Sequence, residues 1–264
     1  MNIVVCTKQV PDTAATLKVD EQSNVSWGDA PLVLNPWDEY AVEEALRLKE
    51  KHGGKVTVAA MGPDATREAL KQAVAMGCDE AVQLWDPAID GSDAPATAMI
   101  LAKAIEKTGA DLVICGKQAI DGDTGLVPPG LAHRLNWPLL AFVAKIRDLD
   151  PAAKTITVER LLEEGRQVVS SRLPAVVAVV KEINEPRYPS FMGIRKASKM
   201  QPTVWSAADL GVDPASAGRG AAGVQWTRIF ALPPREGTVE FITGDSPEEI
   251  AAKLADKLMA EKVI

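Results

Sequence analysis

The amino-acid sequence predicts an α/β protein in which helices cover both faces of a mainly parallel sheet. Its 264 residues are 47% hydrophobic and 25% charged, which is ordinary globular composition. Up to residue 136, short β-branched apolar runs alternate with helical patterns, as they do in β-α-β crossovers. From residue 139, strand-like runs follow one another directly, so we expect antiparallel strands to extend the sheet.

The chain opens on a strand, Asn2–Cys6, followed by a polar excursion, 11–31, whose few apolar residues allow only a small hairpin. A helix comes next. Asn35 can cap this helix and Pro36 suits its first position, while a glycine pair at 53–54 ends it. The first connection between strands is therefore expected to be helical.

The same alternation predicts the later elements. Strands are expected at 55–61, 80–85 and 111–115, and helices at 64–76, from Ser92 or Asp93 to about 107, and from Pro128 and Pro129 to about 136. Four strand-like runs come next, at 139–146, 155–160, 167–171 and 175–180. The stretch 184–223 is rich in Pro, Gly and Ser with little periodicity, and a last helix at 246–259 follows the run 238–243. A long irregular segment that stays ordered usually wraps a partner, so we expect partner contacts there.

Charge, cysteine content and hydropathy argue against a nucleic-acid-binding, disulfide-stabilised or membrane-spanning protein. The formal net charge is −7 and the pI about 5.1, so a general role in binding nucleic acid is not expected. Cys6, Cys78 and Cys115 form neither a disulfide framework nor a metal motif, which favours a reducing compartment. The longest apolar runs fall well short of the ~18 residues of a membrane span, and no basic leader precedes the first strand. We therefore expect a cytoplasmic protein.

The strongest candidate site is the stretch Gly116–Gly125, which lies between a buried strand and a helix. Ligands of open α/β sheets bind at the carboxyl ends of strands. Gly122 and Gly125 would let backbone N–H groups approach a phosphate, and the following helix would add its positive end. The pattern therefore favours a phosphate-bearing ligand.

Two carboxylates complicate this interpretation. Asp121 and Asp123 would repel a phosphate, so we expect one of them, or Thr124, to cap the following helix and leave the other N–H groups for the ligand. The alternative is a plain strand–helix turn, for which ten residues would be long.

Other motifs carry less weight. Gly116-Lys117 lacks the Ser or Thr and the upstream Gly of a nucleoside-triphosphatase loop. Gly218–Gly223 has the spacing of a dinucleotide fingerprint, but no apolar strand precedes it, so we interpret it as a loop. His52 and His133 have no neighbours at metal spacing, and no nucleophile elbow is present. We predict no catalytic residue and no metal site.

The segment 181–199 carries five basic and two acidic side chains in an acidic chain. Phe191 and Met192 lie at its centre. A large apolar tip ringed by positive charge is typical of a docking element for acidic partners. The alternative is that these side chains anchor the segment in the core, and the sequence alone leaves both open.

Several stretches resemble electron-transfer flavoprotein β subunits. The longest is the run Val158-x-Arg160-x-x-Glu163-Glu164-Gly165-x-Gln167-x-Val169-x-x-x-x-Pro174-x-Val176-Val177-Ala178. Further stretches that look like this family are Val4–Pro11, Leu34–Asp38, Gly116–Thr124 and Asn184–Tyr188. The likeness runs from residue 1 to about residue 200 and continues more weakly beyond it.

The resemblance implies a fold, a partner and cofactors. It implies a Rossmann-like core similar to adenine nucleotide α-hydrolases, and a heterodimer with an α subunit that binds the redox-active FAD. The family's β subunits hold a second adenine nucleotide in their own core. In the housekeeping branch this nucleotide is a structural AMP, and in the electron-bifurcating branch it is a second FAD that NADH reduces.

The family's functional positions carry over onto matching residues. The positions expected to contact the nucleotide are Cys6, Asn35, Pro36, Trp37, Asp38, Met61, Gly116, Lys117, Gln118, Ala119, Ile120, Asp121, Gly122, Asp123, Thr124, Gly125, Leu126 and Val127. The positions expected to dock partners are Tyr188, Phe191, Met192, Ile194, Lys196 and Lys199, with Phe191 as the apolar anchor. The chain accordingly divides into a nucleotide-binding core, 1–183, a partner recognition loop, 184–200, and a C-terminal arm, 201–264, that packs on the α subunit.

The sequence leaves open to which branch of the family this chain belongs and which of three functions it has. Housekeeping members often carry Asn-Gln-Thr where this chain has residues 125–127, and Ile120–Thr124 looks more like the bifurcating or nitrogen-fixation-linked branch. Leu135–Pro138 and Asn184–Tyr188 look like the housekeeping branch. The first hypothesis is an electron carrier, not an enzyme, that takes electrons from acyl-CoA dehydrogenase-type flavoenzymes to a quinone-linked oxidoreductase. The others are a bifurcating subunit with a second FAD, and a stand-alone protein that binds or hydrolyses adenine nucleotides.

Overall fold

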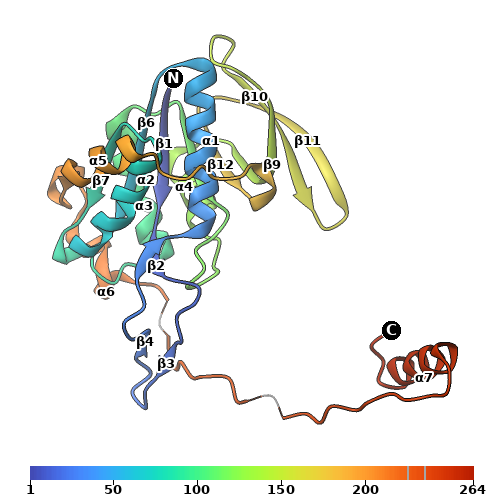
Figure 1. Cartoon of the computed structure of the whole chain (residues 1–264). Coiled ribbons are helices and arrows are strands. Elements are labelled where there is room, and N and C mark those ends of the chain that lie inside the picture. Colours follow the sequence, from blue (N-terminus) through green and yellow to red (C-terminus); the bar gives the residue numbers. More distant parts are fainter. Residues whose placement is uncertain (225, 235) are drawn as a thin grey trace. The chain divides into compact units, whose positions relative to one another are not determined.

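The computed structural model describes residues 1–224, 226–234 and 236–264. The chain forms two compact units, Met1–Arg228 and Ile229–Ile264. The first unit is an α/β structure built on a mostly parallel sheet, which confirms the predicted fold class (Figure 1). Within the described residues, no helix is long and apolar enough to cross a lipid bilayer.

One large sheet organises the first unit. Its strands in the described residues are β1 (Asn2–Thr7), β6 (Lys55–Met61), β7 (Glu80–Leu84), β8 (Leu112–Gly116), β9 (Leu139–Asp150), β10 (Thr155–Leu162), β11 (Gly165–Arg172), β12 (Ala175–Val179) and β13 (Thr203–Trp205). They lie in the order β11-β10-β9-β12-β8-β1-β6-β7-β13. All neighbours from β9 to β13 in that order pair in parallel, whereas β10 pairs antiparallel with both β9 and β11.

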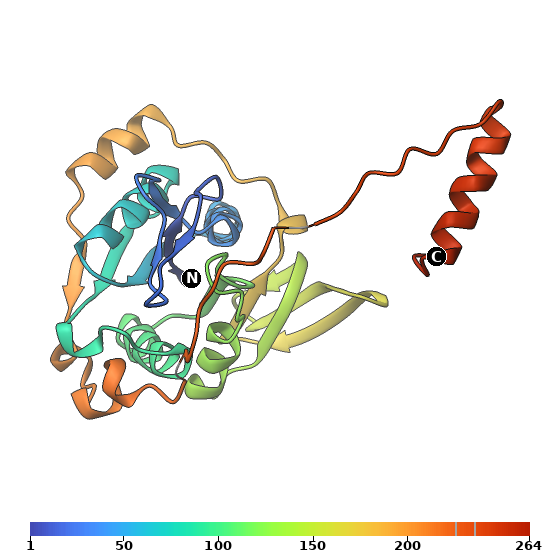
Figure 2. The same cartoon turned by 90° about the horizontal axis from the view of Figure 1, so that it is seen from below.

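Helices cover both faces of this sheet, as predicted. They are α1 (Pro36–His52), α2 (Arg67–Met76), α3 (Ala94–Thr108), α4 (Val127–Leu135) and α5 (Phe191–Lys199). In Figure 2 the blue and cyan helices α1 and α2 lie on one side of the sheet, and the green helices α3 and α4 on the other. Because side chains alternate along a strand, Ile3 and Val5 pack under α1, and Val4 and Cys6 pack under α3.

The strand order places a switch point beside β1. From β1 the chain continues to β6 and β7 on one side, and it enters β8 on the other side only later. Connections that leave in opposite directions open a crevice at the carboxyl ends of the two central strands. This crevice lies where β1 and β8 end, next to the loop that the sequence marks as a candidate site.

Two local predictions need correction. Asn35 takes the N-cap position of α1, as predicted, but its side chain makes no capping hydrogen bond to the first turn. The side chain holds the loop after β8 instead. The strand at 175–179 continues the parallel sheet and does not form a hairpin, since it pairs in parallel with both β8 and β9. Its five residues are all buried, and such an apolar run is stable only between two other strands.

The stretch 184–223 is more regular than predicted. Ser190 caps α5 by accepting a hydrogen bond from the Gly193 amide at 3.0 Å. A Cβ atom at Gly193 would lie 2.1 Å from the Ala75 carbonyl oxygen, so only glycine lets α5 approach α2 this closely. Further on, β13 adds to the sheet edge beside β7. The helix was missed because it is short and has a glycine inside its first turn.

The excursion after β1 forms two small sheets, and the described residues of the second unit include the helix α7. The small sheets pair β2 (Gln9–Pro11) with β5 (Leu32–Leu34), and β3 (Lys18–Val19) with β4 (Val25–Ser26), so the predicted hairpin is present. In the second unit, Ser246 caps α7 (Pro247–Ala260). None of the residues of α7 is buried.

Candidate functional site

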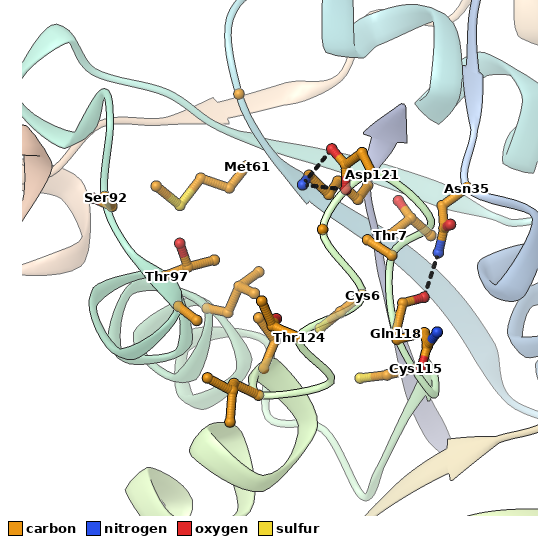
Figure 3. Close-up of a pocket in the computed structure, with 18 of the residues that line it drawn as sticks. Cys6, Thr7, Asn35, Met61, Ser92, Thr97, Cys115, Gln118, Asp121 and Thr124 are labelled. Carbon is orange, nitrogen blue, oxygen red and sulfur yellow. Dashed lines mark hydrogen bonds and ion pairs between the residues drawn. The ribbon is translucent and has the colours of Figure 1, made fainter. Parts of the chain in front are cut away.

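A cavity of about 380 Å³ opens at the carboxyl ends of β1, β6, β7 and β8. This volume is typical of small-molecule sites, which span roughly 300–1,000 Å³. Figure 3 shows its lining, with Cys6 and Thr7 from β1, Met61 from β6, Cys115 from β8 and Thr124 from the following loop. The fold therefore places the cavity where an open α/β sheet binds ligands.

Asn35 fastens the loop after β8 to the start of α1. Its side-chain amide donates to the Gln118 carbonyl at 3.0 Å, and its side-chain oxygen accepts from the Ile120 amide at 3.2 Å (Figure 3). The Asn35 side chain is 1% exposed, so water cannot replace these two bonds. The loop that lines the cavity is thus fixed by one buried amide.

Each of the two loop carboxylates has a polar partner within this chain. Asp121 forms an ion pair with Lys8 at 2.7 Å, and Asp123 accepts a hydrogen bond from the Gln118 side chain at 2.7 Å. Neither acid caps α4, and nor does Thr124, because the capping position is Leu126 and no side chain bonds there. The prediction that one of the three caps the helix is therefore wrong.

The loop also differs from the predicted pattern of free amides. The Gly122 and Asp123 amides already donate to the Ala119 carbonyl. Among the hydrogen bonds of the described residues, none uses the amides of residues 124–127. Pro128 has no amide hydrogen, so the positive end of α4 contributes little beyond those four groups. Left-handed backbone at Asp123 (φ 49°) and Gly125 (φ 60°) bends this stretch into the kind of concave turn that binds anions.

Asp38 closes the floor of the site beneath Gly116. Its carboxylate accepts hydrogen bonds from the Lys8 amide at 2.8 Å and from the Gly116 amide at 3.2 Å. Burial raises the pKa of Asp38 to about 7, despite these bonds and the nearby Lys8 ammonium. A carboxylate thus joins the ends of β1 and β8 to the start of α1.

We expect Asp38 to make the ligand-free chain less stable as pH rises from about 4 to 7. The folded pKa lies above the unfolded value of 3.8, so the native state holds the proton more tightly, and the stabilisation present below pH 4 is lost as pH passes 7. The difference in unfolding free energy between the wild type and Asp38→Asn should fall by about 4 kcal/mol across that window, measured by urea unfolding at several pH values. A difference that stays constant with pH would contradict the raised pKa.

Most of the residues that are predicted from the sequence to contact the nucleotide line this cavity. Those that line it are Cys6, Asn35, Asp38, Met61, Gly116, Gln118, Ala119, Asp121, Gly122, Asp123, Thr124, Gly125, Leu126 and Val127. Pro36, Trp37, Lys117 and Ile120 do not line it. The Lys117 ammonium lies 4.6 Å from the centre of the Trp37 ring, so these two side chains pack on each other behind the loop.

One wall of the cavity was missed from the sequence. It consists of Thr7, Lys8, Gly62, Pro63, Trp85, Ile89, Asp90, Gly91, Ser92, Ala94, Thr97, Leu101 and Pro128. The rule that ligands bind at carboxyl ends of strands, applied to β6 and β7 as well as β8, would have found Gly62 and Trp85. Residues such as Leu101 come from the interior of α3, and no sequence signal marks them.

The positions nominated for partner docking lie on and beside α5. Tyr188 is 95% exposed and Phe191 82% exposed, so the alternative that Phe191 anchors the segment in the core is wrong. Met192 and Ile194 are also exposed. Lys196 is engaged structurally, because its ammonium donates to the Cys78 carbonyl at 2.9 Å. Lys199 lies in the last turn of α5.

Arg187 holds the exposed segment on α1. Its guanidinium pairs with Glu43 at 2.7 Å and with Glu50 at 2.5 Å. Burial would raise the pKa of Glu43, but hydrogen bonds from Arg187 and Arg47 outweigh it and lower that pKa below its usual value. The Asn184 side chain adds a bond to the Tyr40 carbonyl at 3.1 Å. The exposed side chains of Phe191 and Met192 therefore follow a segment that is held firmly on α1.

Comparisons with known proteins identify the family of this chain. Residues 28–210 match the electron transfer flavoprotein domain. The chain is 40% identical, over the whole of both proteins, to the caffeyl-CoA reductase-Etf complex subunit CarD of Acetobacterium woodii. It is 41% identical, again over both full lengths, to the electron transfer flavoprotein subunit beta of Thermoanaerobacterium thermosaccharolyticum. Protein FixA of Azorhizobium caulinodans is 42% identical over 81% of this chain and 78% of its own.

The family match covers β6, β7, β8 and the loops after them, and the two full-length relatives also cover β1. The relative from Thermoanaerobacterium thermosaccharolyticum is named as a β subunit of this family. The chain therefore belongs to the electron transfer flavoprotein family and is one of its β subunits.

Proposed function

We propose that this chain is the nucleotide-holding subunit of a heterodimeric electron carrier in the cytoplasm. An adenine nucleotide occupies the cavity at the ends of β1 and β8, and an α partner supplies the redox-active FAD. Electrons pass from acyl-CoA dehydrogenase-type flavoenzymes to the α-bound flavin and on to a quinone-linked oxidoreductase. The chain itself positions the cofactors and presents a docking surface.

The cavity is the observation that carries this proposal. Its lining includes the buried Cys6 and Cys115 side chains and apolar side chains such as Ile89 and Leu101, which suit a purine ring. The unused amides of residues 124–127 lie at one end of it and suit a phosphate. Because the Lys8 ammonium pairs with Asp121, an anionic ligand would meet less repulsion from that carboxylate, whereas Asp123 keeps its charge because the Gln118 amide is neutral.

A second candidate is that the cavity holds a second FAD, which NADH reduces. Residues 125–127 lack polar side chains that could bind a nucleotide phosphate, so recognition would rest on the main chain. Trp85, Ile89 and Leu101 extend the cavity beyond the positions that were nominated for the adenine nucleotide, which leaves room for a larger one. The full-length likeness to a subunit of a caffeyl-CoA reductase complex favours a partner that acts on CoA thioesters.

A census of bound nucleotides separates these two functions. The chain is purified with its α partner and denatured, and the released FAD and AMP are counted per heterodimer. We expect at least one adenine nucleotide beyond the FAD of the α subunit. One AMP would favour the carrier, and a second FAD together with reduction by NADH would favour bifurcation. A heterodimer with neither extra nucleotide would overturn the proposed site.

The second unit fits the same proposal. Its apolar side chains are exposed within this chain, with Phe241 at 85% and Val239 at 78%. A segment that buries so little apolar surface of its own needs a partner surface to stay ordered. We propose that this unit packs on the α subunit.

Replacing Phe191 with Ala should slow electron transfer from the dehydrogenase at least tenfold. The ring is 82% exposed at the start of a helix that Arg187 and Ser190 hold in place, so it is available as an anchor for a partner. Flavin content and thermal stability should not change. Leu17→Ala, a similarly exposed apolar side chain in the β3–β4 hairpin region, is the matched control. Equal steady-state rates for Phe191→Ala and the wild type would remove the docking role.

A further inference from the structure

Two cysteines face each other at the floor of the cavity. Cys6 on β1 and Cys115 on β8 are direct partners in the parallel register, and both side chains point to the same face of the sheet. Both line the cavity, and Figure 3 shows them close together on their two strands. Neither forms a disulfide. Neither side chain has a part in the proposed electron transfer.

The register brings their backbones within reach of a disulfide. Paired residues on neighbouring strands have Cα atoms about 4.8 Å apart, and disulfides bridge Cα separations of about 4.4–6.8 Å. The third cysteine, Cys78, is fully buried and does not line the cavity. The chain therefore contains one cavity dithiol and one isolated internal thiol of the same chemical type.

We propose that Cys6 and Cys115 form a redox-responsive dithiol, which closes to a disulfide when the cavity is empty and is shielded when a nucleotide fills it. The oxidant is hydrogen peroxide. Two S–H bonds break and one S–S bond forms, the two thiols lose two protons and two electrons in total, and the peroxide O–O bond breaks as it takes them up to give two waters. Access decides the outcome, because each thiol is at most 6% exposed and the cavity is the side from which small molecules can reach it.

The surroundings make this dithiol slow to react. A hydrogen bond with Cys6, burial and the nearby Asp38 carboxylate all raise the pKa of Cys115. The thiolate is the reactive form, so oxidation requires excess peroxide or long exposure. Cys6 and Cys115 thus stay reduced while a nucleotide fills the cavity. They form the disulfide under sustained oxidation once the nucleotide has dissociated.

Peptide mapping of the heterodimer tests the proposal. The full-length chain with its α partner is stripped of nucleotide, treated with hydrogen peroxide, digested without reductant and analysed by mass spectrometry. We expect a linked pair of peptides that contain Cys6 and Cys115, with Cys78 still alkylatable. Cys115→Ser should abolish the link and Cys78→Ser should leave it unchanged. Failure of the wild-type peptides to link would overturn the proposal.

A second arm tests the shielding, which rests on the proposed nucleotide site. AMP or FAD at about 100 times its Kd should slow formation of the link about 100-fold, because only the empty fraction reacts. An unchanged rate, with the nucleotide shown to be bound by co-elution, would overturn the shielding. If neither nucleotide binds, the proposed function fails, whereas the link in the empty cavity still reports on the dithiol.

Discussion

Gly116→Ala should release the nucleotide and lower the free energy of unfolding by about 1–3 kcal/mol. A Cβ atom at this position would lie 2.6 Å from Asp38 Oδ1 and 2.7 Å from the main-chain carbonyl carbon of Trp37. Main-chain atoms cannot turn aside as a flexible side chain can, so the start of α1 would have to move away from β8. The midpoint of thermal unfolding should fall by about 3–10 °C, and the purified heterodimer should carry less than a tenth of its usual extra nucleotide.

The control for this substitution lies in the same loop. A Cβ atom at Gly122 would meet only the Thr124 methyl group, at 4.0 Å. Gly122→Ala should therefore keep the unfolding free energy within about 0.5 kcal/mol of the wild type. The explanation through close packing would fail if Gly116→Ala and Gly122→Ala melted at the same temperature.

Asn35→Ala should weaken nucleotide binding at least tenfold and cost about 1–3 kcal/mol of stability. The substitution leaves the Gln118 carbonyl and the Ile120 amide without their partner at a place that water barely reaches. The loop would then lose the fixed shape that presents its amides to the ligand. Calorimetric titration with AMP and with FAD measures the binding, and urea unfolding measures the stability.

Asn24→Ala provides the comparison. Asn24 lies in the β3–β4 hairpin region, is exposed, and bonds only locally to Asp20 at 2.9 Å. Its loss should change neither the dissociation constant nor the midpoint of urea unfolding. A normal dissociation constant for Asn35→Ala would show that the loop holds its shape without this residue.

The sequence predicts those features of the fold that depend on neighbouring residues. Asp93 and Ser246 were recognisable as capping residues because the partner amide lies three residues along, at Ala96 and Glu249. The alternation of strands and helices predicts parallel pairing because crossover connections leave no other arrangement. The position of the cavity followed from the rule on strand ends, since Gly116 comes directly after a buried run.

Features that depend on distant residues were not predictable. Asn35 looks like a cap in sequence, and only the fold reveals that Gln118, 83 positions away, is its partner. Similarly, nothing near Asp121 in the sequence indicates that Lys8 neutralises it across 113 positions. The sequence left open whether Phe191 is a core anchor or an exposed tip, because either role places a large apolar side chain in a polar stretch. Long-range pairing decided each of these cases.

The bare apolar surface of the second unit bears on the life of the protein in the cell. Copies synthesised without a companion would display Leu232, Val239 and Phe241 to the proteases that remove unassembled chains. Supply of the two subunits would then be balanced by destruction of the surplus, even if their synthesis were unequal.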